Sequence, residues 1–324
     1  MVDVKNNFNL SFDLLKNNKY LFLPFFLSFV LFLISIFFFI FASGIHEPIK
    51  DYMELNKQYD EMVQKQLMQG DPSSMTFEQY MQGKLNFSDY SYLLSFETLL
   101  YFIISLLMWL LLSSYMINVG YYQNSQKLIN PKKNISFSNS LVESISFYIK
   151  YLIIRVTIMI ILYAPLILLL GLSIWMMVSD MIILGILLLL FGLLFSVFWM
   201  VYMGLKFFFA PAILYMEGGD VNSSLKNSKS LAYMKSSLEL AKGRMKKILF
   251  VAFIVYGISL FMNYVSSQPL SSIITDILVT SNIITIFTLV ILMIFFIILQ
   301  AFLSCFLSIF VFHSYLDIKQ NNGE

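Results

Sequence analysis

Three charged side chains stand at the ends of long apolar runs, where a carboxylate and a cation interact with little competition from water. They are Arg155, Lys206 and Glu217. If the segments that carry them pack together, we expect Glu217 to form an ion pair with Arg155 or Lys206 and so to fix the chain at the inner membrane boundary. The alternative is that both cations extend separately to lipid headgroups.

The side chains that most often carry out catalysis or bind metals are scarce. The two histidines, His46 and His313, fall in segments predicted on opposite sides of a membrane, so they cannot share a metal ion. Cys305 is the one cysteine, which excludes an intramolecular disulfide and a cysteine-ligand cluster. The sequence contains no G-x-S-x-G, H-E-x-x-H or G-x-x-x-x-G-K-[ST] motif. We therefore predict no catalytic residue, metal site or cofactor, and we expect that the protein is not an enzyme.

The composition indicates what kind of scaffold positions these residues. Hydrophobic residues make up 59% of the 324 residues, charged residues make up 12%, and the mean hydropathy is +0.77. A chain of this length cannot hide so much apolar surface inside a water-soluble globule. Six windows lack Asp, Glu, Lys and Arg, and each can supply the stretch of about 20 apolar residues that crosses a hydrocarbon core about 30 Å thick. The windows are Tyr20–His46, Thr98–Gln126, Val156–Ser179, Met181–Leu205, Ile248–Thr275 and Ile277–Leu316.

These windows predict an all-α integral membrane protein in which six transmembrane helices pair as three helical hairpins. The third and fourth windows are separated by Asp180 alone. A continuous helix through both would be about 75 Å long, so the chain must reverse near Asp180. We treat residues 1–324 as a single polytopic membrane domain.

The basic residues set the orientation, because they stay in the cytoplasm when they flank a span. Of the 21 basic residues, only Lys50, Lys57, Lys65 and Lys84 fall on the opposite side in this arrangement. We therefore predict a multi-pass protein of the cell membrane with both termini in the cytoplasm. The first span has a basic flank like that of a signal peptide, but its apolar core is too long, which predicts a retained anchor. Membrane topology and attraction to anionic headgroups explain the basic inner surface, so nucleic acid is not an expected partner.

A basic residue precedes each odd-numbered span, at Lys19, Lys150 and Lys247, and an amphipathic segment comes before it each time. The pattern predicts three repeats of an interfacial helix, a span, an outer turn and a second span. A Lys before an apolar run is also common by chance, which leaves the repeat open. The apolar residues at helical spacing are Phe8, Phe12 and Leu15 in the first segment, Leu141, Ile145 and Tyr148 in the second, and Leu231, Met234, Leu238, Ala241 and Met245 in the third.

Residues 43–92 form the only sizeable connection outside the membrane, and we predict an extracytoplasmic helical loop that caps the spans. Apolar residues recur at helical spacing from Ile49 to Leu67, and Gly70 follows as a helix stop. A second short helix begins at Thr76, whose hydroxyl can open a capping box. The apolar face of this cap could pack on the outer ends of the spans or bind a partner.

The stretch FFFAPAILYMEGGDVNSSLKNSKS, residues 207–230, connects the fourth span to a basic segment. Pro211 lacks the amide proton that a continuing helix would use, so the span should break or kink there. Residues 207–216 would then run along the inner interface or re-enter it shallowly.

Beyond this break the residues are suited to ending one helix and starting another. Gly218 and Gly219 permit a left-handed helix stop, and Asp220 can cap the helix that follows. Lysines surround an apolar stripe in that helix. We predict a cytoplasmic basic amphipathic helix within residues 217–247.

This junction resembles a known family. Apolar residues lead into Ala-Pro-Ala, a short apolar stretch, Glu-Gly and then a helix that bears Ser and Lys, a pattern similar to the membrane domain of some glycerophosphodiester phosphodiesterases and to related six-span prokaryotic membrane proteins of uncharacterised families. The resemblance implies a six-span membrane fold. The soluble catalytic barrel of those phosphodiesterases has no counterpart in this chain, so the resemblance implies no hydrolase activity here. The matching residues are Ala210, Pro211, Ala212, Glu217, Gly218, Ser224, Leu225, Ser228 and Leu231.

Small and polar residues form stripes along three of the spans. In lipid such stripes usually mark close packing between helices, and the alternative is a permeation path. A proton-coupled pump would place ionisable groups near the midplane, and the sequence has none there. The stripes are Gln300, Ser304 and Ser308 in the sixth span, Ser105, Trp109 and Ser113 in the second, and Gly185, Gly192 and Ser196 in the fourth.

Two functions of different classes fit these observations. The first is a membrane scaffold or accessory subunit that interacts with membrane lipids or with a partner membrane protein through its basic inner helix and its outer cap. The alternative is a transporter or lipid-handling channel with a central cavity between the three hairpins. The absence of midplane charges favours the first.

Overall fold

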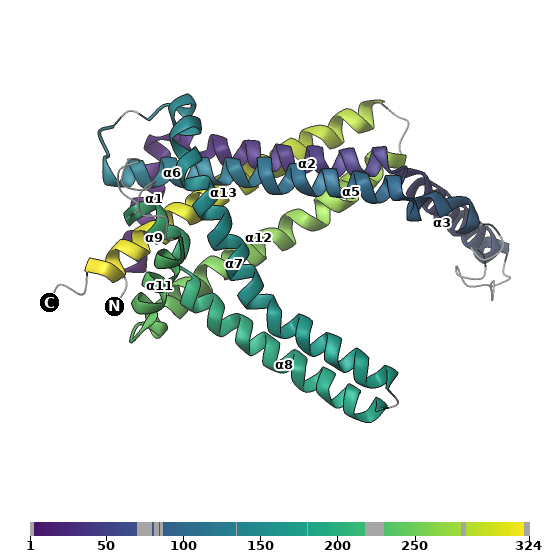
Figure 1. The fold of residues 1–324 in the computed structure, drawn as a ribbon. Coiled ribbons are helices and arrows are strands. Elements are labelled where there is room, and N and C mark those ends of the chain that lie inside the picture. The colour runs from purple at the N-terminus through teal and green to yellow at the C-terminus, as the bar shows by residue number, and fades with distance from the viewer. Residues whose placement is uncertain are drawn as a thin grey trace. The chain divides into compact units, whose positions relative to one another are not determined.

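The computed structural model describes residues 3–69, 80, 84, 87–133, 135–179, 181–217, 230–279 and 283–320 (Figure 1). Every regular element in these ranges is a helix, which confirms the predicted all-α class. The elements are α1 (Val4–Asn17), η1 (Lys19–Phe22), α2 (Leu23–Ala42), α3 (His46–Gln69), η2 (Phe87–Leu94), α5 (Phe96–Met108), η3 (Trp109–Ser113), α6 (Ser114–Ile129), α7 (Phe137–Val178), α8 (Ile182–Phe207), α9 (Ala210–Glu217), α11 (Ser230–Ala241), α12 (Met245–Val279) and α13 (Ile283–Gln320).

Five helical stretches within the described ranges are long and apolar enough to cross a membrane, which indicates a multi-pass membrane protein. The predicted fifth span lies in α12, where the side chains of residues 262–263 and 265–285 are outside the description. The structure therefore supports five spans by length and composition, and the sixth stays a prediction. The five stretches are Lys19–Ala42, Phe96–Ile129, Phe137–Val178, Ile182–Glu217 and Ile286–Gln320.

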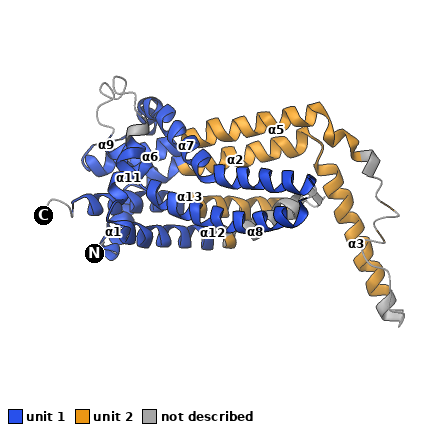
Figure 2. Cartoon of the chain, turned by 60° about the horizontal axis from the view of Figure 1, so that its bottom comes forward, with its two compact units in different colours: residues 1–24, 117–261, 303–324 blue, residues 25–116, 262–302 orange. Residues whose placement is uncertain are grey.

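The chain divides into two compact units (Figure 2). Four helices, α2, α6, α12 and α13, contribute residues to both units. Unit 1 comprises residues 1–24, 117–261 and 303–324, and unit 2 comprises residues 25–116 and 262–302.

In unit 2, α2 packs along the segment formed by α5 and the π-helical turn η3 (Figure 1). The hydroxyls of Ser28 and Ser113 are 2.8 Å apart, and the Ser105 hydroxyl donates a hydrogen bond of 2.7 Å to the Ser35 carbonyl. The Trp109 ring contacts Phe32 on α2. The stripe predicted on the second span is therefore a packing face, as expected for small and hydroxyl-bearing residues in lipid.

The turn before α3 depends on a glycine. Gly44 has a φ of 73°, a backbone conformation that glycine adopts without steric cost. The Tyr92 ring lies against this turn, and its hydroxyl hydrogen-bonds the Gly44 carbonyl at 3.2 Å and the Glu47 carboxylate at 3.1 Å. Because the first of these bonds joins η2 to the start of α3, the two ends of the predicted outer loop are held together.

Helix α3, His46–Gln69, lies within the predicted outer loop. The predicted stop at Gly70 lies outside the described residues. The predicted apolar face of α3 is only half-buried at Ile49 and Met53. The second helix, predicted to begin at Thr76, lies outside the described residues.

Helix α1 covers the first segment predicted to be an interfacial helix, and its buried residues are mainly polar. Phe8 and Phe12 are 42% and 48% exposed, and the buried residues are Asn7, Ser11 and Leu15. In lipid an apolar side chain gains nothing by turning inward, whereas small and polar side chains allow close approach and hydrogen bonds between helices. The location of α1 in the membrane surface stays a prediction.

The start of α7 shows the same distribution of side chains. Ile145 is 55% exposed, and Ser140 and Ser144 are buried. Helix α7 also runs without interruption for 42 residues, so the second predicted interfacial segment is continuous with its span instead of forming a separate helix. Nothing at Lys150 interrupts the hydrogen-bonded backbone, because no Pro or Gly stands there.

Helices α7 and α8 form an antiparallel hairpin within unit 1, and the chain reverses next to Asp180 as predicted (Figure 1). The Ser173 hydroxyl donates to the Gly185 carbonyl at 2.7 Å, and the Trp199 indole donates to the Ile161 carbonyl at 2.8 Å. Gly192 is buried against Leu169 of α7. The small-residue stripe of the fourth span, which also includes the buried Ser196, is a packing face.

A short turn separates two helices next to Pro211. Helix α8 ends at Phe207, a two-residue turn follows, and Pro211 occupies the first turn of α9, where its missing amide proton costs no hydrogen bond. Beyond this turn, Ile213, Leu214 and Tyr215 are buried in the core of unit 1. The position of residues 207–216 relative to the inner membrane interface stays a prediction.

The basic segment after α9 is described only in part. The candidate turn residues Gly218, Gly219 and Asp220 lie outside the described residues. Helix α11 confirms a helix within the predicted range 217–247, and it packs on α7, α8 and α9.

Candidate functional site

Polar side chains gather in the interior of unit 1, and α6 carries more of them than any other helix. Asn118, Gln123 and Asn124 on α6 are all 0% exposed. Burial of an amide is costly unless it is hydrogen-bonded, so the hydrogen-bond partners of these three side chains show how the interior is held together. We call this set the polar core; it consists of Asn118, Tyr122, Gln123, Asn124, Ser140, Glu143, Ser144, Tyr215 and Ser308.

The first group of hydrogen bonds joins α6 to α7. The Asn118 amide donates to the Ser144 carbonyl at 3.0 Å, and the Gln123 amide donates to the Ser140 hydroxyl at 3.1 Å. The Tyr122 hydroxyl donates to a carboxylate on α7, that of Glu143, at 2.5 Å. These bonds explain why α7 turns its serines inward.

The second group joins α6 to α13. The Asn124 amide donates to the Ser308 hydroxyl, and it also lies 3.8 Å from the Cys305 sulfur. The Cys305 thiol donates to the Leu21 carbonyl of η1 at 3.3 Å. The lone cysteine is thus a buried hydrogen-bonding residue of the interior.

Helix α9 enters the polar core through Tyr215. Its hydroxyl donates to the Asn118 side-chain carbonyl at 2.7 Å, so Asn118 connects α9 with α7. The Tyr215 ring is surrounded by other aromatic rings, with centroid distances of 5.7 Å to Tyr121, 5.8 Å to Phe147 and 6.3 Å to Phe312. A single side chain therefore connects α9 with α6, α7 and α13.

The last residue of α9, Glu217, is held by α13. Its carboxylate accepts hydrogen bonds from the Tyr315 hydroxyl and from the Lys319 ammonium, the latter at 2.6 Å. These three residues form what we call the Glu217 clamp. Burial raises the pKa of Tyr233 on α11, and the negative charge of Glu217 raises it further, which places α11 near the clamp.

The predicted partners of Glu217 were Arg155 and Lys206, and the structure gives it different ones. Lys206 lies over the Tyr202 ring at 4.1 Å from the centroid. Arg155 is within hydrogen-bonding reach of the Tyr151 hydroxyl, one turn earlier on α7. The three candidates are therefore not one cluster. The prediction failed because it paired the third and fourth spans, whereas α9 bends back to reach the sixth.

The side chains of the polar core are hydrogen-bonded to side chains or backbone carbonyls of neighbouring helices. The carboxylates of Glu143 and Glu217 accept hydrogen bonds from tyrosine hydroxyls, and the remaining members other than tyrosine carry amides or hydroxyls. Among the described residues, no group of three potential metal ligands comes together. His313 lies half-buried on α13, and His46 lies at the start of α3, with its ring 5.1 Å from that of Phe41.

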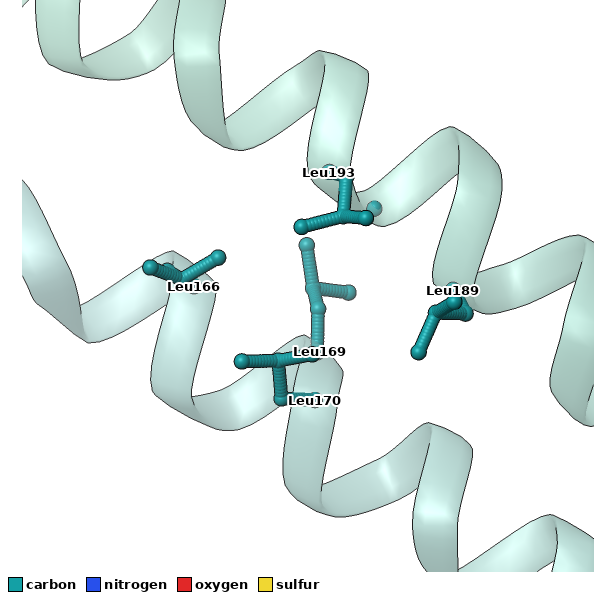
Figure 3. Close-up of a pocket in the computed structure, with 6 residues that line it drawn as sticks. Leu166, Leu169, Leu170, Leu189 and Leu193 are labelled. Carbon is teal, nitrogen blue, oxygen red and sulfur yellow. The ribbon is translucent and has the colours of Figure 1, made fainter. Parts of the chain in front are cut away.

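A small hollow lies between α7 and α8 (Figure 3). It is too narrow to hold a water molecule, and the side chains that line it are apolar. Such a hollow offers no polar group to orient a ligand, so it is not a binding site for a polar substrate. The lining residues are Leu166, Leu169, Leu170, Leu189, Gly192 and Leu193.

Sequence reasoning missed the amide-bearing part of α6. The signal was present as the stretch NVGYYQNSQ, residues 118–126, in which several amides and hydroxyls fall inside an uncharged window. Because this stretch contains no charged residue, it falls inside the window predicted for the second span. A run of amides at the end of a span is expensive in lipid and predicts burial against other helices.

Comparison of the chain with protein-family models, with curated proteins and with solved structures gave no match. The resemblance of residues 207–231 to a membrane-domain family therefore stays a prediction. A function must therefore be inferred from the structure of unit 1.

Proposed function

We propose that this chain is a non-enzymatic multi-pass membrane protein that serves as a scaffold or accessory subunit, in contact with membrane lipids and with a partner membrane protein. The observation that carries the proposal is the polar core, whose amides and hydroxyls bond one helix to another. Side chains engaged in this way hold helices together and are not free to bind or transform a substrate.

The outward surfaces support the same proposal. Large apolar side chains on α7 and α8 are widely exposed, including Leu168 at 70%, Phe191 at 68% and Phe198 at 74%. An apolar surface of this kind needs lipid or another membrane protein to cover it. A scaffold with a rigid polar interior and an apolar exterior offers both kinds of contact.

The topology we propose has six spans in three hairpins, with both termini in the cytoplasm and a fold like that of the phosphodiesterase membrane domains. The hydrogen bond of 3.0 Å from the Asp3 amide to the Asp317 carboxylate supports it. Because α1 and the end of α13 meet, the chain must cross the membrane an even number of times between them. The sixth crossing would be α12.

Cysteine labelling tests this topology. Cys305 is fully buried, so the natural chain should give little background with an impermeant maleimide. We expect Lys57→Cys on α3 to react from outside intact cells and Lys242→Cys to react only after the membrane is opened. Equal labelling of both positions from outside would refute the proposed orientation.

Purification from the native membrane in mild detergent tests the scaffold function. Mass spectrometry of the purified material should find one membrane protein at constant stoichiometry with this chain. Absence of such a partner, together with substrate flux in proteoliposomes that contain this chain alone, would replace the proposal by the alternative of a transporter or lipid-handling channel.

One observation favours that alternative. The side-chain carbonyl of Gln123 and the hydroxyl of Ser314 are buried without a hydrogen-bond partner. Buried polar atoms are rarely left unsatisfied, and a water molecule or a substrate could meet them. The flux assay should therefore include the Gln123→Leu variant, since a transport path through unit 1 would lose activity on that change.

A further inference from the structure

The turn between α11 and α12 gathers basic side chains. Gly243, with a φ of 77°, reverses the chain after α11. Lys242 and Lys246 are exposed, and Arg244 is half-buried. Glu239 is the one acidic residue between residues 230 and 261, so the turn carries a net positive charge.

One of these cations, Lys246, belongs to the outward stripe of α12. At about 100° per residue, Phe250 and Phe253 lie about 40° and 20° from Lys246 around the helix axis. Phe250 is 49% exposed and Phe253 is 74% exposed, whereas Ile248 and Val251 on the opposite side are buried. The stripe therefore begins with a cation and continues with exposed aromatic side chains.

The length of this stripe matches a lipid and not a free anion. Lys246 and Phe253 are separated by about 10 Å along the helix axis. The headgroup layer on each side of a bilayer is about 5–8 Å thick, since the whole bilayer is about 40–45 Å and its hydrocarbon core about 30 Å. A phosphate at Lys246 would therefore place the attached acyl chains beside Phe253.

We propose that the α11–α12 turn and the first turns of α12 bind one anionic phospholipid. Its phosphate contacts Lys242, Arg244 and Lys246, and its acyl chains lie along Phe250 and Phe253. Charge complementarity selects an anionic over a zwitterionic headgroup, because Lys242, Arg244 and Lys246 outnumber Glu239, the one acidic residue between residues 230 and 261. The inference rests on the proposed function only in taking membrane lipids as partners, and it stands whether or not a protein partner is found.

Lipid titration of the purified chain tests this site. The inner triple variant changes the three basic residues of the turn to Gln, and the control changes the three lysines of α3 to Gln. Native mass spectrometry counts bound phosphatidylglycerol against phosphatidylcholine in detergent. We expect the inner triple variant to lose at least tenfold in its preference for phosphatidylglycerol, since each cation near an anionic headgroup contributes about fivefold. The control lysines are Lys50, Lys57 and Lys65.

The outcomes separate the proposal from simpler explanations. An equal preference for phosphatidylglycerol in the wild type and the inner triple variant would overturn the site. An equal loss of that preference in the control variant would also overturn it, because it would show that the lipid responds to the overall charge of the protein. Displacement of the lipid by inorganic phosphate would show that only an anion binds. If the triple variant does not fold, the single change Lys246→Gln, at an exposed side chain, should still lower the preference about fivefold, and Lys246→Arg should retain it.

Discussion

The hydrogen bond between Tyr215 and Asn118 makes a direct test of the polar core. Tyr215→Phe removes the hydroxyl that donates to the Asn118 side-chain carbonyl at 2.7 Å and keeps the ring among its aromatic neighbours. Asn118 is fully buried, so its side-chain carbonyl loses the hydrogen bond from Tyr215 with no water to replace it. Interhelical bonds in membranes average about 0.6 kcal/mol, whereas an unsatisfied buried acceptor costs about 1–3 kcal/mol. We expect a loss of about 1.5 kcal/mol.

Thermal unfolding in detergent measures this loss. At about 2 °C per kcal/mol for a chain of this size, the midpoint should fall by about 3 °C. The matched control is Tyr264→Phe, which removes a hydroxyl from a side chain that is 72% exposed and should leave the midpoint within about 1 °C.

A double-mutant cycle identifies the bond as the cause. In an Asn118→Leu background the acceptor is absent, so Tyr215→Phe should cost almost nothing further. If Tyr215→Phe lowers the midpoint equally in both backgrounds, the hydroxyl does not act through Asn118 and the proposed role of the polar core in holding α9 is refuted.

Three further predictions concern the contacts of unit 1. Glu217→Ala and Lys319→Ala should each lower stability by less than about 1 kcal/mol, because the pair is partly exposed, and a double-mutant cycle in SDS unfolding should find them coupled. Gly185→Ala should destabilise by about 1–3 kcal/mol in the same assay, since the new Cβ would lie 2.6 Å from a methionine side chain of α7, whereas Gly171→Ala meets nothing within 4 Å and should be neutral. Trp199→Phe should cost about 0.6 kcal/mol in thermal unfolding, because its indole bond to an α7 carbonyl is lost.

Each of these predictions has a result that contradicts it. Additive losses at Glu217 and Lys319 would mean that the Glu217 clamp does not act as a pair. Equal effects of alanine at Gly185 and Gly171 would mean that α7 and α8 are not in close contact. A Trp199→Phe variant as stable as the wild type would mean that the indole hydrogen bond does not stabilise the α7–α8 hairpin.

The sequence predicted those features that depend on one strong local rule. The reversal beside Asp180 follows from bilayer thickness, and the break at Pro211 follows from a missing amide proton. Five of the six predicted spans correspond to apolar helical stretches that the structure describes. The packing faces of the second and fourth spans follow from small and hydroxyl-bearing residues such as Ser105 and Gly192.

The sequence did not predict which side of the first amphipathic segment is buried. Phe8 and Phe12 are exposed and Asn7 and Ser11 beside them are buried, because small and polar side chains allow close approach between helices. The partner of Glu217 could not be predicted either. Its choice depends on α9 folding back into unit 1, a long-range feature that no local spacing records.

The burial of α9 has a consequence for how the protein is made. The aromatic enclosure of Tyr215 uses Phe312, and the cation that neutralises Glu217 is Lys319, both on α13, which is synthesised after the other described helices. Until that helix is inserted, the preceding segments expose amides and a carboxylate to the bilayer. Maturation must therefore pass through a vulnerable intermediate, and membrane quality-control proteases should degrade chains that stop short of α13.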